Sequence, residues 1–391
     1  MRDDSNLPAS PDFIDHPLGP PIAAVSPSAT GLRIDWADGV TMDASRFWLR
    51  ENEVAADIVD PETRERVLRI ADVPDNLAIA GAEIEPEGAV RVIWEPDHRQ
   101  SRFHPGWLRH TAEGGWRPQA GLPARESWTA ARMPELPTFD GPGVLDDDAA
   151  LKGWLGALYR YGIARLVDVP LADGTVERVA RRIGTIRASN FGFLFTVESK
   201  PDPDSTAYTG AALEGHTDLA SREVQPGIQM LHCQENTSEG GASTMVDGFA
   251  VAEAIRAEDP EAFGSLVRDR WLFSNRHPET DFRWSGPLVE TDIAGNIVEI
   301  RNTGFLRANP DMESARVEIA YKAVRLFAER AAENRFTCRS RFRAGDLVAF
   351  DNRRILHGRD SFDPRTGSRR LQGCYLETDE LLSRLRVLNR P

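Results

Sequence analysis

The sequence has few cysteines. Three occur among its 391 residues, Cys233, Cys338 and Cys374, and no two of them form a CxxC pair. Disulfide frameworks and thiolate zinc sites both need several suitably spaced cysteines, so neither is predicted. Each cysteine is expected to be a small buried side chain, and a reducing, cytoplasmic setting is expected for the chain.

The sequence also lacks long apolar runs and an excess of positive charge. No run approaches the roughly 20 apolar residues of a membrane span, and Met1–Asp4 leads into no apolar secretory signal. The formal net charge is −14, which argues against a partner rich in phosphates, such as nucleic acid. We therefore expect neither a membrane nor a nucleic acid as a partner.

Common nucleotide-binding and hydrolase motifs are missing as well. The glycine pairs Gly114-Gly115 and Gly240-Gly241 stand outside any GxGxxG or P-loop context. No GxSxG nucleophile elbow occurs. The chemistry has to be sought in other residue types.

The apolar pattern divides the chain into three parts. Residues 1–30, rich in Pro, Ser and Asp, are expected to be a flexible segment. Residues 31–118 contain short alternating runs such as Leu32–Trp36, which are typical of strands, so a small β-rich domain is expected. Residues 119–391 open with a Pro-rich linker and are expected to form the larger domain.

Helices are predicted where apolar residues recur at helical spacing. They cover residues 148–161, 175–187, 250–256 and 312–332. The last is expected to bury a stripe of Val317, Tyr321, Val324 and Ala328. The rest of 200–378 reads as short strands. The sequence thus predicts a mainly β fold with covering helices, and a double-stranded β-helix, or jelly roll, best suits an enclosed metal site.

The first chemical feature is His216-Thr217-Asp218. If this segment is a strand, residues i and i+2 point to the same face, so the imidazole and the carboxylate can reach one point. Two such groups are two corners of a 2-His-1-carboxylate iron site. An isolated HxD is weak evidence, because it occurs often by chance.

The second feature completes the set. His357 follows the apolar run 346–350, and Arg369 comes twelve residues after it. His357 is the predicted third metal ligand. The guanidinium of Arg369 can hold a carboxylate in a bidentate fork.

These residues, with several longer stretches, resemble the γ-butyrobetaine and trimethyllysine hydroxylase family within the taurine-dioxygenase-like oxygenases. The resemblance spans residues 31–391. The matching stretches are Phe47–Arg50, Asp60–Arg64, Ala207–Thr209, His216–Asp218, Pro226–Cys233, Gly240–Gly241, Val246–Phe249, Phe350–Asn352, His357–Arg359 and Ser383–Arg386.

The resemblance implies a jelly-roll enzyme that uses Fe(II), 2-oxoglutarate and O2 to hydroxylate an unactivated C–H bond. His216, Asp218 and His357 would hold the iron and serve catalysis. Arg369 would bind the far carboxylate of 2-oxoglutarate, and Ser243 would offer it a hydroxyl. Relatives are often dimers, so a homodimer is expected.

In the same family an aromatic cage holds a trimethylammonium group by cation–π attraction. The corresponding positions here are Phe191, Phe195, Tyr208 and Tyr375. The implied substrate is a small quaternary-ammonium zwitterion resembling γ-butyrobetaine.

The chain departs from the family at two places. Relatives carry zinc-binding cysteines just after a Trp-Leu-Arg-Asp-Asn stretch, whereas Glu53–Asp57 contains none, and His104 alone cannot hold zinc. No structural zinc is therefore expected. In the substrate pocket, Leu219 replaces a frequent Tyr, and Arg301 stands at the end expected to receive the substrate's anion.

Arg301 keeps a second substrate open. A guanidinium suits a tetrahedral dianion as well as a carboxylate, so 2-(trimethylammonio)ethylphosphonate is an alternative to γ-butyrobetaine. An oxygenase for an unrelated amine or sulfonate would need no aromatic cage. An inactive cupin-like binding protein would keep the fold without the chemistry.

Overall fold

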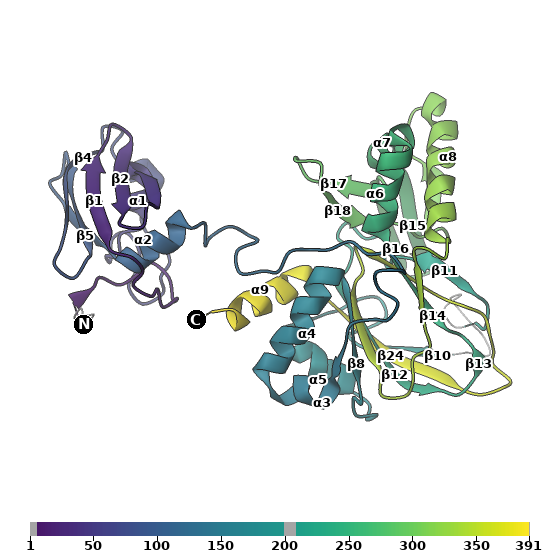
Figure 1. Ribbon diagram of the computed structural model, residues 1–391. Coiled ribbons are helices and arrows are strands. Elements are labelled where there is room, and N and C mark those ends of the chain that lie inside the picture. Colours follow the sequence, from purple (N-terminus) through teal and green to yellow (C-terminus); the bar gives the residue numbers. More distant parts are fainter. Residues whose placement is uncertain (1–5, 199–208, 391) are drawn as a thin grey trace. The chain divides into compact units, whose positions relative to one another are not determined.

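The computed structural model describes residues 6–198 and 209–390. The chain separates into two compact units, Met1–Gly121 with Arg390–Pro391, and Leu122–Asn389 (Figure 1). Among the described residues, no helix combines the length and the apolar character needed to cross a membrane.

The smaller unit contains two three-stranded antiparallel sheets and short helices. The first sheet runs β1 (Ile22–Pro27), β2 (Gly31–Trp36), β3 (Thr41–Ser45), and the second runs β4 (Ala78–Ile84), β5 (Val90–Glu95), β6 (Gln100–Phe103). The helices are α1 (Arg46–Glu51), the 3-10 turn η2 (Ile70–Asp72) and α2 (Pro105–Ala112). Ile34, Trp94 and Trp107 are among the side chains of its apolar core.

The flexible segment predicted over residues 1–30 is wrong for its last part. Ile22–Pro27 forms strand β1, which pairs with β2. Because β1 is an edge strand, it tolerates a serine and a proline, the residue types that led to the prediction of a flexible segment. His16, upstream of it, is buried.

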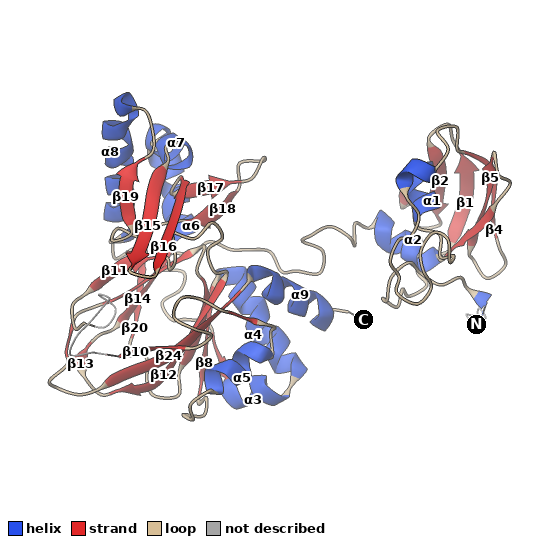
Figure 2. Ribbon diagram, turned by 180° about the vertical axis from the view of Figure 1, so that it is seen from behind, coloured by secondary structure: helices blue, strands red, loops and turns tan. Residues whose placement is uncertain are grey.

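The larger unit is built on two facing, mainly antiparallel sheets (Figure 2). The larger sheet has the order β10 (Phe195–Glu198), β24 (Arg369–Leu376), β12 (Ile228–Asn236), β21 (Leu347–Asp351), β8 (Ile163–Val167), β7 (Thr138–Asp140), with β9 (Ile186–Arg187) also on β24 and β7 parallel to β8. The smaller sheet has the order β11 (Leu213–His216), β22 (Ile355–Arg359), β14 (Ser243–Asp247), β20 (Thr337–Ser340).

Side chains from both sheets share one apolar core. Cys233, Phe350 and Leu371 from the larger sheet pack with Met245 and Ile355 from the smaller one. The predicted jelly roll with covering helices is thereby confirmed.

Helices cover the outer face of the larger sheet (Figure 1). They are α3 (Gly141–Asp146), α4 (Asp148–Tyr161), α5 (Thr175–Arg181) and α9 (Thr378–Leu388). Helix α4 begins where the Asp147 carboxylate accepts from the Ala150 N–H and ends at Gly162, whose φ of 74° is easy only for glycine. Its Leu151 and Leu155 pack against the sheet.

A second group of helices and hairpins packs beside the smaller sheet. It contains α6 (Gly248–Glu258), α7 (Pro260–Arg268) and α8 (Ser314–Ala331). Its strands are β15 (Trp271–His277), β16 (Thr280–Gly286), β17 (Val289–Thr291), β18 (Ile297–Ile300) and β19 (Arg307–Pro310), and a short pair joins β13 (Glu239–Gly240) to β23 (Phe362–Asp363).

Candidate metal and cosubstrate site

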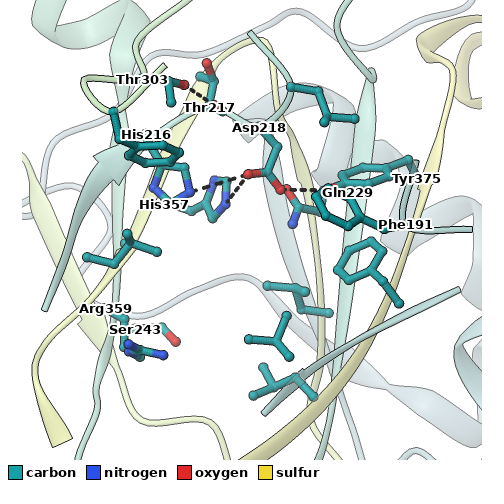
Figure 3. Close-up of a pocket in the computed structure, with 18 of the residues that line it drawn as sticks. Phe191, His216, Thr217, Asp218, Gln229, Ser243, Thr303, His357, Arg359 and Tyr375 are labelled. Atoms are coloured by element: carbon teal, nitrogen blue, oxygen red, sulfur yellow. Dashed lines mark hydrogen bonds and ion pairs between the residues drawn. The ribbon is translucent and has the colours of Figure 1, made fainter. Parts of the chain in front are cut away.

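The two histidines of the predicted triad lie on neighbouring strands of the smaller sheet. His216, the last residue of β11, is paired in register with His357 on β22, and their ring centroids are 4.2 Å apart. The Asp218 Oδ1 lies 3.4 Å from His216 Nε2 and 3.7 Å from His357 Nε2 (Figure 3). The pairing of β11 with β22 thus brings together residues 216 and 357, which lie 141 positions apart in the sequence.

Asp218 reaches the site by a different route from the one predicted. Strand β11 ends at His216, so Asp218 does not share a strand face with it. It lies in the following turn, where Asn352 holds its backbone. The Asn352 Oδ1 accepts from the Asp218 N–H at 2.7 Å, and the Asn352 amide donates to the Asp218 carbonyl at 3.1 Å.

The neighbours of Asp218 fix the rest of the turn. The Thr303 hydroxyl donates to the Thr217 carbonyl, and the Thr217 N–H donates to the Asn302 carbonyl at 2.8 Å. Leu219 takes a left-handed φ of 55°, which is uncommon for a residue with a side chain. The turn is therefore held by surrounding contacts rather than by local preference.

The charges of the triad suit metal binding. Burial opposes ionisation of Asp218, but His357, His216 and the Tyr375 hydroxyl together hold the pKa of this carboxyl well below its usual value. Burial, with His216 beside it, lowers the pKa of His357 to about 3. The site thus offers an ionised carboxylate and a neutral imidazole, the forms that bind metal.

The donor set fits a metal ion. One ligand atom from each of His216, Asp218 and His357 lies within 4.8 Å of the others, and no second such group occurs among residues 6–198 and 209–390. The His216 Nδ1 lies 2.9 Å from the Glu214 carbonyl, which leaves Nε2 for a ligand bond. Two imidazoles and one carboxylate, with room beside them, match non-haem Fe(II) oxygenases.

The residues predicted for the cosubstrate line the same pocket. It has a cavity of about 160 Å³, and its wall includes His216, Ser243, Arg359 and Arg369. No carboxylate pairs with Arg369 among the described residues, and its Nε is buried without a partner. Burial and the nearby Arg359 lower the pKa of Arg369 to about 10, which still leaves a cation at neutral pH. A buried cation lacking an anion fits the far carboxylate of 2-oxoglutarate.

Three of the four predicted cage residues meet in this pocket. Phe191, Phe195 and Tyr375 all line it. The ring centroids are 6.4 Å apart for Phe191 and Phe195, and 4.9 Å for Phe195 and Tyr375. Tyr208 lies outside the described residues.

Arg301 does not lie where the prediction needs it. The residue is buried and is absent from the pocket wall. Its guanidinium forms an ion pair with Glu299 at 2.8 Å, lies over the Trp284 ring at 3.6 Å, and donates to backbone carbonyls such as that of Ala220 at 3.0 Å. The structure therefore does not bring Arg301 into the pocket, where the predicted contact with the substrate's anion would have to lie, and its partners already use the cation.

The sequence pattern gave no role to four residues that shape the site. Asn352 holds the Asp218 backbone, and Arg359 donates to the carbonyls of Thr209 and Ala211 at 2.7 Å each. Gln229 and Asn275 line the pocket, each with a buried side-chain oxygen that lacks a partner. Alternation along β12 places Gln229 on the same face as Leu231, a signal that could have found it.

Comparison with known proteins agrees with this geometry. Residues 122–375 match the taurine catabolism dioxygenase TauD, TfdA family, and residues 24–109 match the gamma-butyrobetaine hydroxylase-like N-terminal family. A gamma-butyrobetaine dioxygenase of Pseudomonas sp. (strain AK-1) is 42% identical over 97% of this chain and 99% of its own. The human gamma-butyrobetaine dioxygenase is 30% identical over 91% and 94%, and the rat mitochondrial trimethyllysine dioxygenase 29% identical over 91% and 85%.

A match over most of the larger unit and a relative this similar over nearly the full length establish the family. The donor set and the unpaired cation add the chemistry. The chain belongs to the TauD, TfdA dioxygenase family, and it is a 2-oxoglutarate-dependent, non-haem iron dioxygenase.

Proposed function

We propose that the enzyme hydroxylates an unactivated C–H bond of a small quaternary-ammonium zwitterion, with γ-butyrobetaine as the first candidate. The observation that carries this proposal is the group of three aromatic rings beside the triad. Phe191, Phe195 and Tyr375 stand on the wall that also carries Asp218. Aromatic faces attract a desolvated cation by about 2 kcal/mol or more.

The pocket favours a methylated cation over a primary ammonium. Among the described residues of its wall, Asp218 is the one acid, and its carboxylate oxygens already face the two histidines and Tyr375. The three ring faces offer no acceptor for the N–H groups of a primary ammonium, so its lost hydration would have to be replaced by the amide oxygens of Gln229 and Asn275 on the same wall. A trimethylammonium group has no N–H to satisfy.

The names of the relatives support the same chemistry. The matched proteins are gamma-butyrobetaine and trimethyllysine dioxygenases, and both named substrates carry a trimethylammonium group. Both named substrates also carry a carboxylate, so the relatives favour a carboxylate over a phosphonate at the other end. The phosphonate alternative has lost the support of Arg301, whose contacts lie away from the pocket.

Each part of the pocket has a separate task in this proposal. His216, Asp218 and His357 would hold the iron, and the bound iron would supply the dioxygen chemistry that converts 2-oxoglutarate to succinate and carbon dioxide. Arg369 anchors the far carboxylate of 2-oxoglutarate, with Ser243 nearby. The side chains of Leu219, Leu231 and Leu371 make part of the pocket wall apolar and help to exclude water.

A substrate panel tests the proposal. Succinate release would be measured with Fe(II), 2-oxoglutarate and one of three compounds: γ-butyrobetaine, its unmethylated analogue 4-aminobutyrate, or 2-(trimethylammonio)ethylphosphonate. We expect at least one trimethylated compound to exceed 4-aminobutyrate about 30-fold in kcat/KM, which corresponds to about 2 kcal/mol. Equal rates with 4-aminobutyrate, or no release with either trimethylated compound, would refute the proposal.

A further inference from the structure

Asp218 is held at its backbone and at one carboxylate oxygen, and the other carboxylate oxygen is left for a metal. Asn352 holds the backbone N–H and carbonyl. The carboxylate Oδ1 faces the Nε2 atoms of both histidines. The outer oxygen, Oδ2, accepts from the Tyr375 hydroxyl at 2.7 Å (Figure 3).

Tyr375 is well fixed to do this. It lies on β24, in register with Gln229 on β12 and Arg187 on β9, and its side chain is almost fully buried. Its ring packs against Phe195 with a centroid distance of 4.9 Å. Because backbone and ring are both held, the hydroxyl is a fixed donor rather than one that finds the carboxylate by chance.

From these contacts we propose that Tyr375 is a positioning residue for the metal ligand Asp218. The hydroxyl occupies Oδ2 and thereby keeps the carboxylate turned so that Oδ1 alone is presented beside the two histidines. The same side chain contributes a ring to the proposed cation pocket, so one residue serves ligand geometry and substrate binding. The second half of this inference rests on the proposed function, but the first does not.

The physical reason is the rotation of the carboxylate. Without a partner on Oδ2, the carboxylate can turn about its Cβ–Cγ bond. Metal binding would then have to order it, and the lost entropy would lower the affinity for the metal. Hydrogen bonds to metal ligands typically contribute a factor of about 10–100 in metal affinity or activity. The loss of one hydroxyl at Tyr375 should therefore be visible in metal binding, without any turnover.

The test compares Tyr375→Phe with Phe195→Leu. Tyr375→Phe keeps the ring and its volume but removes the donor, whereas Phe195→Leu removes a neighbouring ring and leaves the donor. Mn(II) affinity of the metal-free protein would be followed by the electron paramagnetic resonance signal of free Mn(II). Tyr375→Phe should weaken Mn(II) binding about 10-fold or more, and Phe195→Leu should change it less than about twofold.

In substrate kinetics, the two variants should show the reverse order of effects. Phe195→Leu should raise the KM for the trimethylated substrate more than Tyr375→Phe does, because Tyr375→Phe retains a ring face. Melting temperatures of the two metal-free variants verify that both fold. Mn(II) binding by Tyr375→Phe within about fivefold of the wild type, or an equal loss of Mn(II) affinity in Phe195→Leu, would overturn the positioning role.

The Mn(II) measurement needs no substrate. If the substrate panel fails while Tyr375→Phe still weakens Mn(II) binding, the proposed function is wrong and the positioning role stands. If the panel succeeds and Mn(II) binding is unchanged, the positioning role is wrong and the proposed function stands.

Discussion

At the scale of single residues, the sequence pattern predicted a His-Asp-His group that the structure brings together, but it did not predict the residues that support this group. His216, Asp218 and His357 carry a chemical pattern that sequence displays directly. Asn352 and Tyr375 contact Asp218 from segments that are distant in the sequence, and residue spacing does not reveal such contacts. Arg301 shows the converse error, since a charge in the right stretch was taken for a substrate contact although its partners lie elsewhere.

Arg369 gives a residue-scale prediction with a matched control. Arg369→Ala should raise the 2-oxoglutarate concentration needed for half-maximal activity sharply, because a buried carboxylate loses a charge-assisted partner worth about 2–5 kcal/mol. Arg370→Ala should have little effect, since Arg370 is half-exposed and pairs with Asp173 at 3.2 Å. Steady-state kinetics of both variants measure this, and the reverse result would show that Arg370 is the cosubstrate residue.

At the scale of elements, long periodic segments were predicted well and short ones were not. The helix expected over 148–161 is α4. The helix expected over 175–187 ends at Arg181, and β9 covers Ile186–Arg187. Strand β1 had no clear alternation, whereas helix α9 was missed although Leu381, Leu385 and Leu388 recur at helical spacing.

The stripe predicted for α8 was right at Val324 and wrong at Tyr321 and Ala328, which are exposed. Ala320, Ala323, Val324 and Phe327 are buried, whereas Tyr321 is 49% exposed. Tyr321 contacts Trp271 edge to face at a centroid distance of 4.8 Å. Its apolar ring was counted as core because periodicity alone cannot tell a ring at the rim from one inside.

A buried ion pair gives the prediction at this scale. Arg354, in the turn that carries the chain from β21 to β22, forms a two-pronged pair with Asp247, at the end of β14, at 3.0 and 2.7 Å. Both side chains are buried. Asp247→Ala should lower the free energy of unfolding by about 3–5 kcal/mol, because it leaves an unpaired buried cation.

Urea unfolding of the full chain would measure this change, and Asp363→Ala is the control. Asp363 pairs with the largely exposed Arg365, so its removal should leave the unfolding midpoint nearly unchanged. Equal effects of Asp247→Ala and Asp363→Ala would show that the buried pair has no special importance.

At the scale of the whole molecule, the sequence indicated two units of the right kind, while the detailed topology needed the structure. The smaller unit contains no cysteine. In the segment where zinc-binding cysteines were sought, Arg99 pairs with Glu53 at 2.8 Å and with Asp57 at 2.6 Å. Ser101 donates to the same Glu53 at 2.6 Å. A polar network therefore ties this segment to β6.

The homodimer expected from the resemblance stays a prediction.

The absence of structural zinc is the prediction for this unit. Protein purified without added metal should contain no stoichiometric zinc by elemental analysis, and a chelator should not change its melting temperature. Arg99→Ala should destabilise the unit by about 1–3 kcal/mol, less than a fully buried pair because Arg99 is partly exposed. A full equivalent of zinc that survives chelation would contradict this account of the unit.

The measurement that tests the central claim most directly is the yield of two products from one reaction. With Fe(II), 2-oxoglutarate, O2 and γ-butyrobetaine, succinate and a singly hydroxylated product should form in equal amounts. Asp218→Ala should form neither, although its melting temperature in the absence of metal stays close to that of the wild type. Equal product yields in wild type and Asp218→Ala would contradict the assignment of His216, Asp218 and His357 as the iron site.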